Sequence, residues 1–179
     1  MRPHLLGIDD GPFDRHRDAD VPLVGVMMEG PDLVEGVAIT RFPVDGFGVT
    51  DVLASWITSQ RWHATLQGVV LGGITLAGLA VVDVQELAER LTRPVFVVTR
   101  HDTRTSTLAD ALRSAGFLER LPLLERTPPA RRLRDGLFLA AAGTDAVRAR
   151  RLILAACGKA NLPEALRVAH LVASALVRG

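Results

Sequence analysis

Apolar segments that end in turn residues dominate the first third of the chain and predict three β-strands. The expected strands cover residues 5–9, 22–28 and 33–41, and apolar positions alternate only in part along the third. The highly charged stretch 13–20 predicts a solvated loop, and residues 29–32 predict a turn because they contain Gly and Pro. Short links of this kind favour antiparallel pairing of the three strands.

The rest of the chain alternates helical and strand patterns. Thr50 is expected to be an N-cap with Asp51 in the first helical turn, and the apolar spacing that follows predicts a helix ending near residues 61–63. Further expected elements are a strand over Gly68–Leu71, a loop over 74–80, a helix capped by Asp83 and running through Leu91, a strand over 94–99, a helix over 105–116, a surface link over 126–134, a strand over 137–141, and helices over 145–157 and 163–177. This order predicts one α/β domain over residues 1–179, in which three antiparallel strands precede alternating helices and parallel strands, with helices at the C-terminus.

Composition narrows the class of protein without naming a function. The 179 residues are 48% hydrophobic and 23% charged, which is typical of a globular chain, and the net charge of +1 indicates no general attraction to polyanions. Lys159 is the only lysine among 21 basic residues; genome composition or bidentate phosphate binding by arginine would each explain this bias. The single Cys157 excludes an internal disulfide and a multi-cysteine metal site.

Targeting signals are also not expected. The chain enters a strand within its first residues, which leaves no room for a signal peptide, and no apolar run reaches the length that spans a bilayer. We therefore expect a cytoplasmic protein with no membrane partner.

Five segments together resemble one known family. They are GIDDGPF at 7–13, VDG at 44–46, LGGITLAGLAVVD at 71–83, PVFVVTR at 94–100 and LPEALRVAHLVASALVRG at 162–179. In this order they resemble the endonuclease dU family, which is widespread in archaea and similar in fold to endonuclease V. The resemblance covers nearly the whole chain and implies an RNase H-like fold. It also implies a Mg²⁺- or Mn²⁺-dependent endonuclease that acts on DNA carrying a deaminated base such as deoxyuridine.

The endonuclease V pattern is matched only in part. Asp9 stands where that enzyme type has an aspartate on its first strand, but Gly72 and Gly73 occupy the place of its second aspartate. Where it has a glutamate at the start of the first helix, this chain offers only Asp51. A two-metal nuclease needs several carboxylates around one phosphate. Either other residues supply them, or the protein is an inactive nucleic-acid-binding protein with this fold, or a structural or regulatory homodimer.

Four aspartates are candidate catalytic residues: Asp9, Asp10, Asp45 and Asp51. Side chains alternate faces along a strand, so Asp9 and Asp10 cannot both point into the core. Carboxylates at a strand end are suited to hold a divalent metal, and we expect Asp9, Asp10 and Asp51 as its ligands. The structural alternatives are an Asx-type turn at Asp9 and Asp10, a turn residue at Asp45 and a helix-start residue at Asp51.

Candidate substrate-binding residues are Gly72, Gly73, Thr75, Arg100 and Trp62. The backbone N–H groups after Gly72 are suited to cradle a phosphate or sugar, or they form a tight turn. Arg100 follows a buried strand with His101, Asp102 and Arg104, where it would contact a phosphate or lie in solvent. Trp62 would stack on a base or fill the core.

Two further sets of polar residues have simpler structural explanations. Glu164, Arg167 and His170 share one face of the last expected helix at i, i+3 spacing, and a salt-bridged docking face is the favoured interpretation. The arginines between 131 and 151 would follow a nucleic-acid backbone or form a solvated face.

Overall fold

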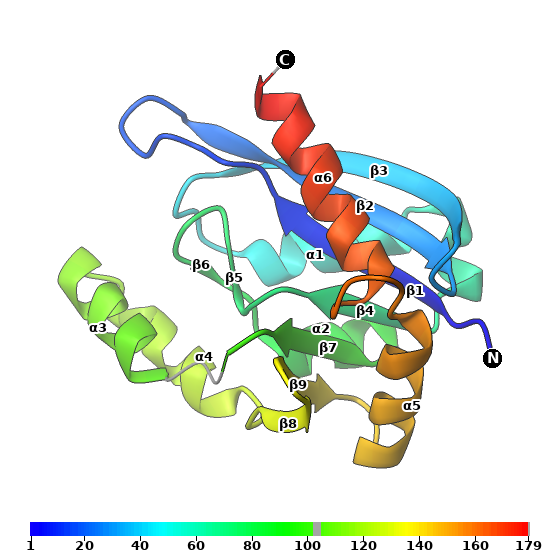
Figure 1. The fold of residues 1–179 in the computed structure, drawn as a ribbon. Helices are drawn as coiled ribbons and strands as arrows, with labels where there is room; N and C mark the ends of the chain where they lie inside the picture. The colour runs from blue at the N-terminus through cyan, green and yellow to red at the C-terminus, as the bar shows by residue number, and fades with distance from the viewer. Residues whose placement is uncertain (102–104, 179) are drawn as a thin grey trace.

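A seven-stranded mixed sheet forms the centre of the protein in this computed structural model, which describes the backbone of residues 1–101 and 105–178 (Figure 1). The strand order is β3-β2-β1-β4-β7-β9-β8. The strands are β1 (His4–Asp10), β2 (Asp20–Glu29), β3 (Leu33–Pro43), β4 (Gly68–Leu71), β7 (Val95–Thr99), β8 (Arg131–Arg134) and β9 (Leu137–Ala142). The first three strands pair antiparallel, β1, β4 and β7 run parallel, and β9 is antiparallel to both neighbours. This confirms the expected mixed α/β fold.

Helices cover both faces of the sheet. One face packs against α1 (Val49–Thr58) and α2 (Val84–Leu91), and the other against α5 (Ala146–Ala156) and α6 (Glu164–Arg178). In Figure 1, α6 crosses β1 and β2 on the near face. The remaining elements are α3 (Thr105–Ala115), α4 (Leu121–Arg126), the short 3₁₀ helices η1 (Arg61–Thr65) and η2 (Leu118–Arg120), and a small hairpin of β5 (Thr75–Leu76) and β6 (Ala80–Val81).

Helix α6 lies unusually close to β1 because both partners present small residues. Ala165, Ala169 and Ala173 repeat every fourth position and form a smooth buried stripe against the sheet. On β1, a Cβ atom added to Gly7 would lie 2.2 Å from the carbonyl carbon of Ala165. Any side chain at position 7 would therefore push the helix away from the strand.

Three local predictions are corrected by the structure. Helix α1 begins at Val49 with Gly48 as its N-cap in the left-handed region, so Thr50 lies inside the helix and its hydroxyl accepts a hydrogen bond from the Asp83 backbone instead. The expected loop over 74–80 contains the β5–β6 hairpin, whose two-residue strands are too short to show an alternating pattern. The expected surface link over 126–134 contains β8. Within the described residues this strand pairs with the later strand β9 alone.

The Asp83 prediction is confirmed, because its side chain accepts a hydrogen bond from the Glu86 N–H and caps α2. No helix in the described part of the chain combines the length and apolarity that crossing a bilayer requires.

Candidate active site

The end of β1 brings a carboxylate against an imidazole from the last helix. Asp9 and Asp10 point to opposite faces of the sheet, as alternation along a strand requires. Asp9 faces α6, where its Oδ2 lies 2.8 Å from Nδ1 of His170. Its Oδ1 accepts a hydrogen bond from the Asp10 backbone N–H at 2.9 Å. The two ends of the chain, 161 residues apart, therefore meet at this pair.

The close packing at Gly7 positions this pair. Gly7 contacts α6 at Ala165, and Asp9 is the next residue of β1 on the same face. Two strand residues advance by about 6.6 Å. The five residues from Ala165 to His170 advance by about 7.5 Å along a helix. The contact at Gly7 therefore holds α6 against β1 in the same region where His170 meets Asp9.

Arginines surround the Asp9–His170 pair. Asp9 and His170 line a cavity of about 560 Å³. Its other walls include Gly72, which directly follows β4, and Arg100, His101 and Arg167. Arg167 is held by the buried Glu164, whose Oε2 accepts hydrogen bonds from Nε at 2.9 Å and Nη2 at 2.6 Å. This interaction raises the pKa of Arg167 above its ordinary value. The cavity is therefore suited to a phosphate, which arginine contacts through paired hydrogen bonds.

A second, mainly apolar cavity of about 710 Å³ adjoins the first, because Gly72 and Thr99 line both. Its walls include Gly73, Ile74 and Thr75 on one side and residues 127–130 on another. The space beside both glycines is open. A Cβ atom added to Gly72 would meet only Leu166, at 3.7 Å, and a Cβ atom added to Gly73 would have no neighbour within 4 Å. Volumes of this size are typical of small-molecule sites, so a base attached to a bound phosphate would fit.

Asp10 lies on the other face of the sheet, away from His170. Its Oδ2 accepts a hydrogen bond from the Ala77 backbone N–H at 2.6 Å, which anchors the β5–β6 hairpin. Burial raises the pKa of Asp10 above its ordinary value, and the neighbouring Asp9 charge adds to this rise. The structure therefore gives Asp10 a clear local role in holding the hairpin.

The structure does not bring Asp45 and Asp51 to Asp9. Asp45 accepts a hydrogen bond from Leu79 N–H at 2.8 Å and pairs with Arg15 at 3.0 Å. Asp51 is exposed on α1 and pairs with Arg90 of α2. Both aspartates therefore connect neighbouring segments of the chain.

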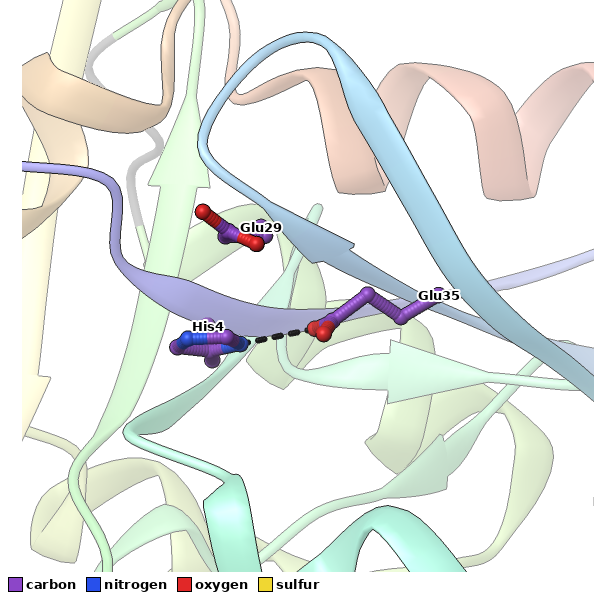
Figure 2. Close-up of side chains that lie close together, drawn as sticks. All are labelled: His4, Glu29 and Glu35. Carbon is purple, nitrogen blue, oxygen red and sulfur yellow. Dashed lines mark hydrogen bonds and ion pairs between the residues drawn. The ribbon is translucent and has the colours of Figure 1, made fainter.

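The donor atoms at Asp9 fit one hydrated divalent ion better than a two-metal centre. Ligands in neighbouring octahedral positions at about 2.1 Å from an ion lie about 3 Å apart, close to the 2.8 Å between Asp9 and His170. Within the described residues, one group of three His, Cys, Asp or Glu side chains has its ligand atoms within 4.8 Å of one another. That group is not at Asp9 but at His4, Glu29 and Glu35 (Figure 2). An ion at Asp9 would therefore take its remaining ligands from water and substrate.

The predicted substrate-binding residues fall into two groups. Gly72, Gly73, Thr75 and Arg100 line the two adjoining cavities. Trp62 instead packs on Gly36 of β3, on the face opposite Asp9, where an added Cβ at Gly36 would lie 2.9 Å from the indole. Asp102 and Arg104 lie outside the described residues.

The sequence pattern favours a structural role for His170 and Arg167, yet both line the cavity with Asp9. The available signal was the i, i+3 spacing of Glu164, Arg167 and His170, which places them on one helix face. The sequence did not reveal that this face docks beside Asp9, because the docking depends on Gly7.

Comparison with known proteins identifies the family. The family model for endonuclease dU matches residues 2–177. The chain belongs to the endonuclease dU family. A UPF0215 protein of Deinococcus radiodurans is 36% identical over 178 residues, covering 98% of this chain and 90% of the relative. A UPF0215 protein of Methanothermobacter thermautotrophicus is 33% identical over 179 residues, covering 98% and 88%.

Solved structures place this endonuclease dU family member in an endonuclease V-like, RNase H-like fold. An Archaeoglobus fulgidus protein of unknown function superposes with a TM-score of 0.91 at 31% identity, covering 99% of this chain and 100% of that chain. Endonuclease V from Streptomyces avermitilis gives 0.65 at 14% identity, covering 99% and 82%. Ciona intestinalis endonuclease V, in complex with DNA containing inosine followed by a ribo-adenosine, gives 0.62 at 10% identity, covering 99% and 87%.

Proposed function

We propose that this protein is an endonuclease that hydrolyses a phosphodiester bond of DNA near a deaminated base, with deoxyuridine as the first candidate. The observation that carries the proposal is the Asp9–His170 pair, which lies in a cavity with two arginines. The family name supports a nuclease, and the Ciona complex supports DNA with a deaminated base as the class of substrate. Cleavage of the strand beside such bases would place the protein in DNA repair.

The residues around Asp9 have distinct roles in this proposal. Arg100 and Arg167 neutralise the phosphate, and Glu164 holds Arg167 in the orientation that paired hydrogen bonds require. Two of the five N–H donors of Arg167 are used by Glu164, which leaves three for a ligand. The fixed guanidinium loses little freedom when the phosphate binds, which favours binding.

A divalent cation would be held by Asp9 and His170. When bound, it would lower the pKa of a coordinated water and polarise the phosphate. A carboxylate with an imidazole is a mixed donor set, which favours a transition ion such as Mn²⁺ over Mg²⁺. Asp10 and Asp51 are engaged elsewhere and are not needed as ligands in this form of the proposal.

The adjoining apolar cavity would receive the base. Gly72 and Gly73 leave their backbone open to it, and Thr75 adds a hydroxyl to the wall. A base that pairs poorly leaves the helical stack at lower cost, so damaged or single-stranded DNA would be preferred.

The test is a cleavage assay on end-labelled oligonucleotides with one deoxyuridine, one inosine or neither, as single strands and as duplexes. Each is incubated with Mn²⁺, Mg²⁺ or EDTA, using wild-type protein and Asp9→Asn. We expect cleavage with Mn²⁺ near the modified base, and none with EDTA or the variant. Glu35→Gln is the matched control, because Glu35 of β3 is also paired with a histidine, His4, which lies at the other end of β1.

Binding without cleavage under every metal condition would overturn the endonuclease proposal and support the nucleic-acid-binding alternative. Cleavage that Asp9→Asn leaves unchanged would place the reaction elsewhere or in a contaminant.

A further inference from the structure

One face at the edge of the sheet exposes a concentration of apolar side chains. Among the described residues, six of the ten most exposed large apolar side chains lie on β3 and α6; they are Leu33, Val34, Val37, Ile39, Leu171 and Leu176. Clusters of this kind mark interaction sites more often than isolated apolar residues do.

Three of these β3 side chains, Val34, Val37 and Ile39, form a row on the face of the sheet that α6 covers. Val37 pairs with Val26 and Ile39 pairs with Val24, and both partners pack against α6. Helix α6 covers β1 and β2 and leaves this row exposed (Figure 1). Ile39 and Leu176 line the same surface hollow, so the row continues onto the helix.

The two outer strands of the sheet differ in how they are protected. Strand β8 has four residues, three of them arginines, and this charge discourages pairing with another strand. Strand β3 has eleven residues, and within the described part of the chain it pairs with β2 alone. It has no lysine, and its one proline is its last residue. Its outer edge therefore offers unpaired backbone groups beside an apolar row.

We infer that β3 pairs with β3 of a second copy of this chain, antiparallel and around a two-fold axis. The alignment that uses the whole strand is centred on Ala38 and places Val37 of one copy opposite Ile39 of the other. Cross-strand pairs of β-branched residues stabilise a sheet. The small Ala38 faces its own copy at the axis.

The size of this contact is adequate for a stable dimer. Eleven residues make a seam of about 36 Å. The strand layer and the layer on its other face, where Trp62 packs on Gly36, are each about 10 Å thick, so the contact face is about 700 Å² per copy. Stable interfaces bury about 800 Å² per partner. The two-fold axis keeps both α6 helices on the same side of the joined sheet, where Leu171 and Leu176 border the seam.

The first test is the mass in solution, by sedimentation or light scattering from 1 to 50 µM. We expect twice 19.3 kDa for the wild type. Val37→Lys and Ile39→Glu should each raise the dissociation constant by more than about tenfold, because each places a charge against an apolar side chain. Val147→Lys is the matched control, since Val147 is 79% exposed on α5 and lies outside the seam. Circular dichroism checks that each variant folds.

Mixing the two variants tests the alignment itself. In the mixed dimer, the lysine of one copy lies opposite the glutamate of the other, while the second pair stays apolar. We therefore expect dimers to re-form on mixing Val37→Lys with Ile39→Glu. A monomeric wild type, or a dimer that neither variant weakens, would overturn the inference and leave this face to another partner. Failure of folded variants to re-associate would overturn the Ala38-centred pairing.

Discussion

The two ends of β1 carry the same pair of chemical groups in different surroundings. At one end Asp9 lies 2.8 Å from His170, and at the other His4 lies 2.7 Å from Glu35 (Figure 2). The His4 end has more ligand atoms, because Glu29 is also near. However, Glu29 already pairs with Arg2 at 3.0 Å, so part of that cluster is neutralised within the protein.

The comparison shows that the pair alone does not define a site. Asp9 and His170 line a cavity with Arg100 and Arg167, next to a second cavity large enough for a base. An ion pair on a strand surface is common without function, whereas arginine donors that converge on a cavity provide a place for an anion. The surroundings therefore favour the Asp9 end for phosphodiester chemistry.

The largest effect is expected from Asp9→Asn, which removes the charge that would hold a cation. Cleavage should fall by at least about 10³-fold, because the carboxylate would hold the cation that activates water and polarises the phosphate. Glu35→Gln should keep wild-type cleavage. Rates from single-turnover cleavage of the deoxyuridine oligonucleotide measure both. Equal losses in the two variants would remove the functional distinction between the two ends of β1.

His170→Ala should reduce cleavage by roughly 10²-fold, in the range found for groups that orient or ligate a catalytic metal. The titration of activity with Mn²⁺ should shift to higher concentration, because one ligand is lost. His4→Ala is the control from the other end of the strand and should leave the Mn²⁺ titration unchanged. The reverse result would place the functional ion at His4.

Glu164→Gln should act through Arg167. The neutral amide holds the guanidinium less firmly, so KM for the oligonucleotide should rise about tenfold while kcat changes little. Arg167→Ala should raise KM at least as much, and the double variant should add little to it, since the two residues share one interaction. Additive effects would show that Glu164 does not position Arg167.

The smallest effect is expected from Asp10→Asn, on stability. Burial raises the pKa of Asp10 in the folded state above the ordinary 3.8, so the folded protein binds this proton more tightly than the unfolded chain. That contribution is complete below the ordinary pKa and is lost as pH rises through the folded pKa. The neutral asparagine does not lose this stability as pH rises, so Asp10→Asn should raise Tm at pH 7, by less than about 4 °C.

The Asp10→Asn difference should vanish near about pH 3, below the ordinary pKa of the carboxyl. Differential scanning calorimetry at the two pH values measures it. A lower Tm for the variant at pH 7 would mean that the charged hydrogen bond to Ala77 outweighs burial.

Local patterns were enough to predict most of the elements. Strand β4 and helix α2 agree with their expected ranges, because apolar periodicity and the Asp83 cap are properties of neighbouring residues. The start of α1 was missed because Thr50 and Gly48 are both suitable caps, and the choice depends on the contact between Thr50 and Asp83. Strand β8 was missed because its arginines show no strand pattern without β9 beside them.

The amino-acid sequence by itself determined most of the sheet, its alternating helices, the family and the position of Asp9 at a strand end. The partners of Asp9 were decided by the tertiary structure. Gly7 lets α6 contact β1, and that contact brings His170 across 161 residues of sequence while Asp45 and Asp51 are engaged by other segments. The physical reason is that secondary structure follows from interactions between near neighbours, whereas a site depends on which distant surfaces can pack closely.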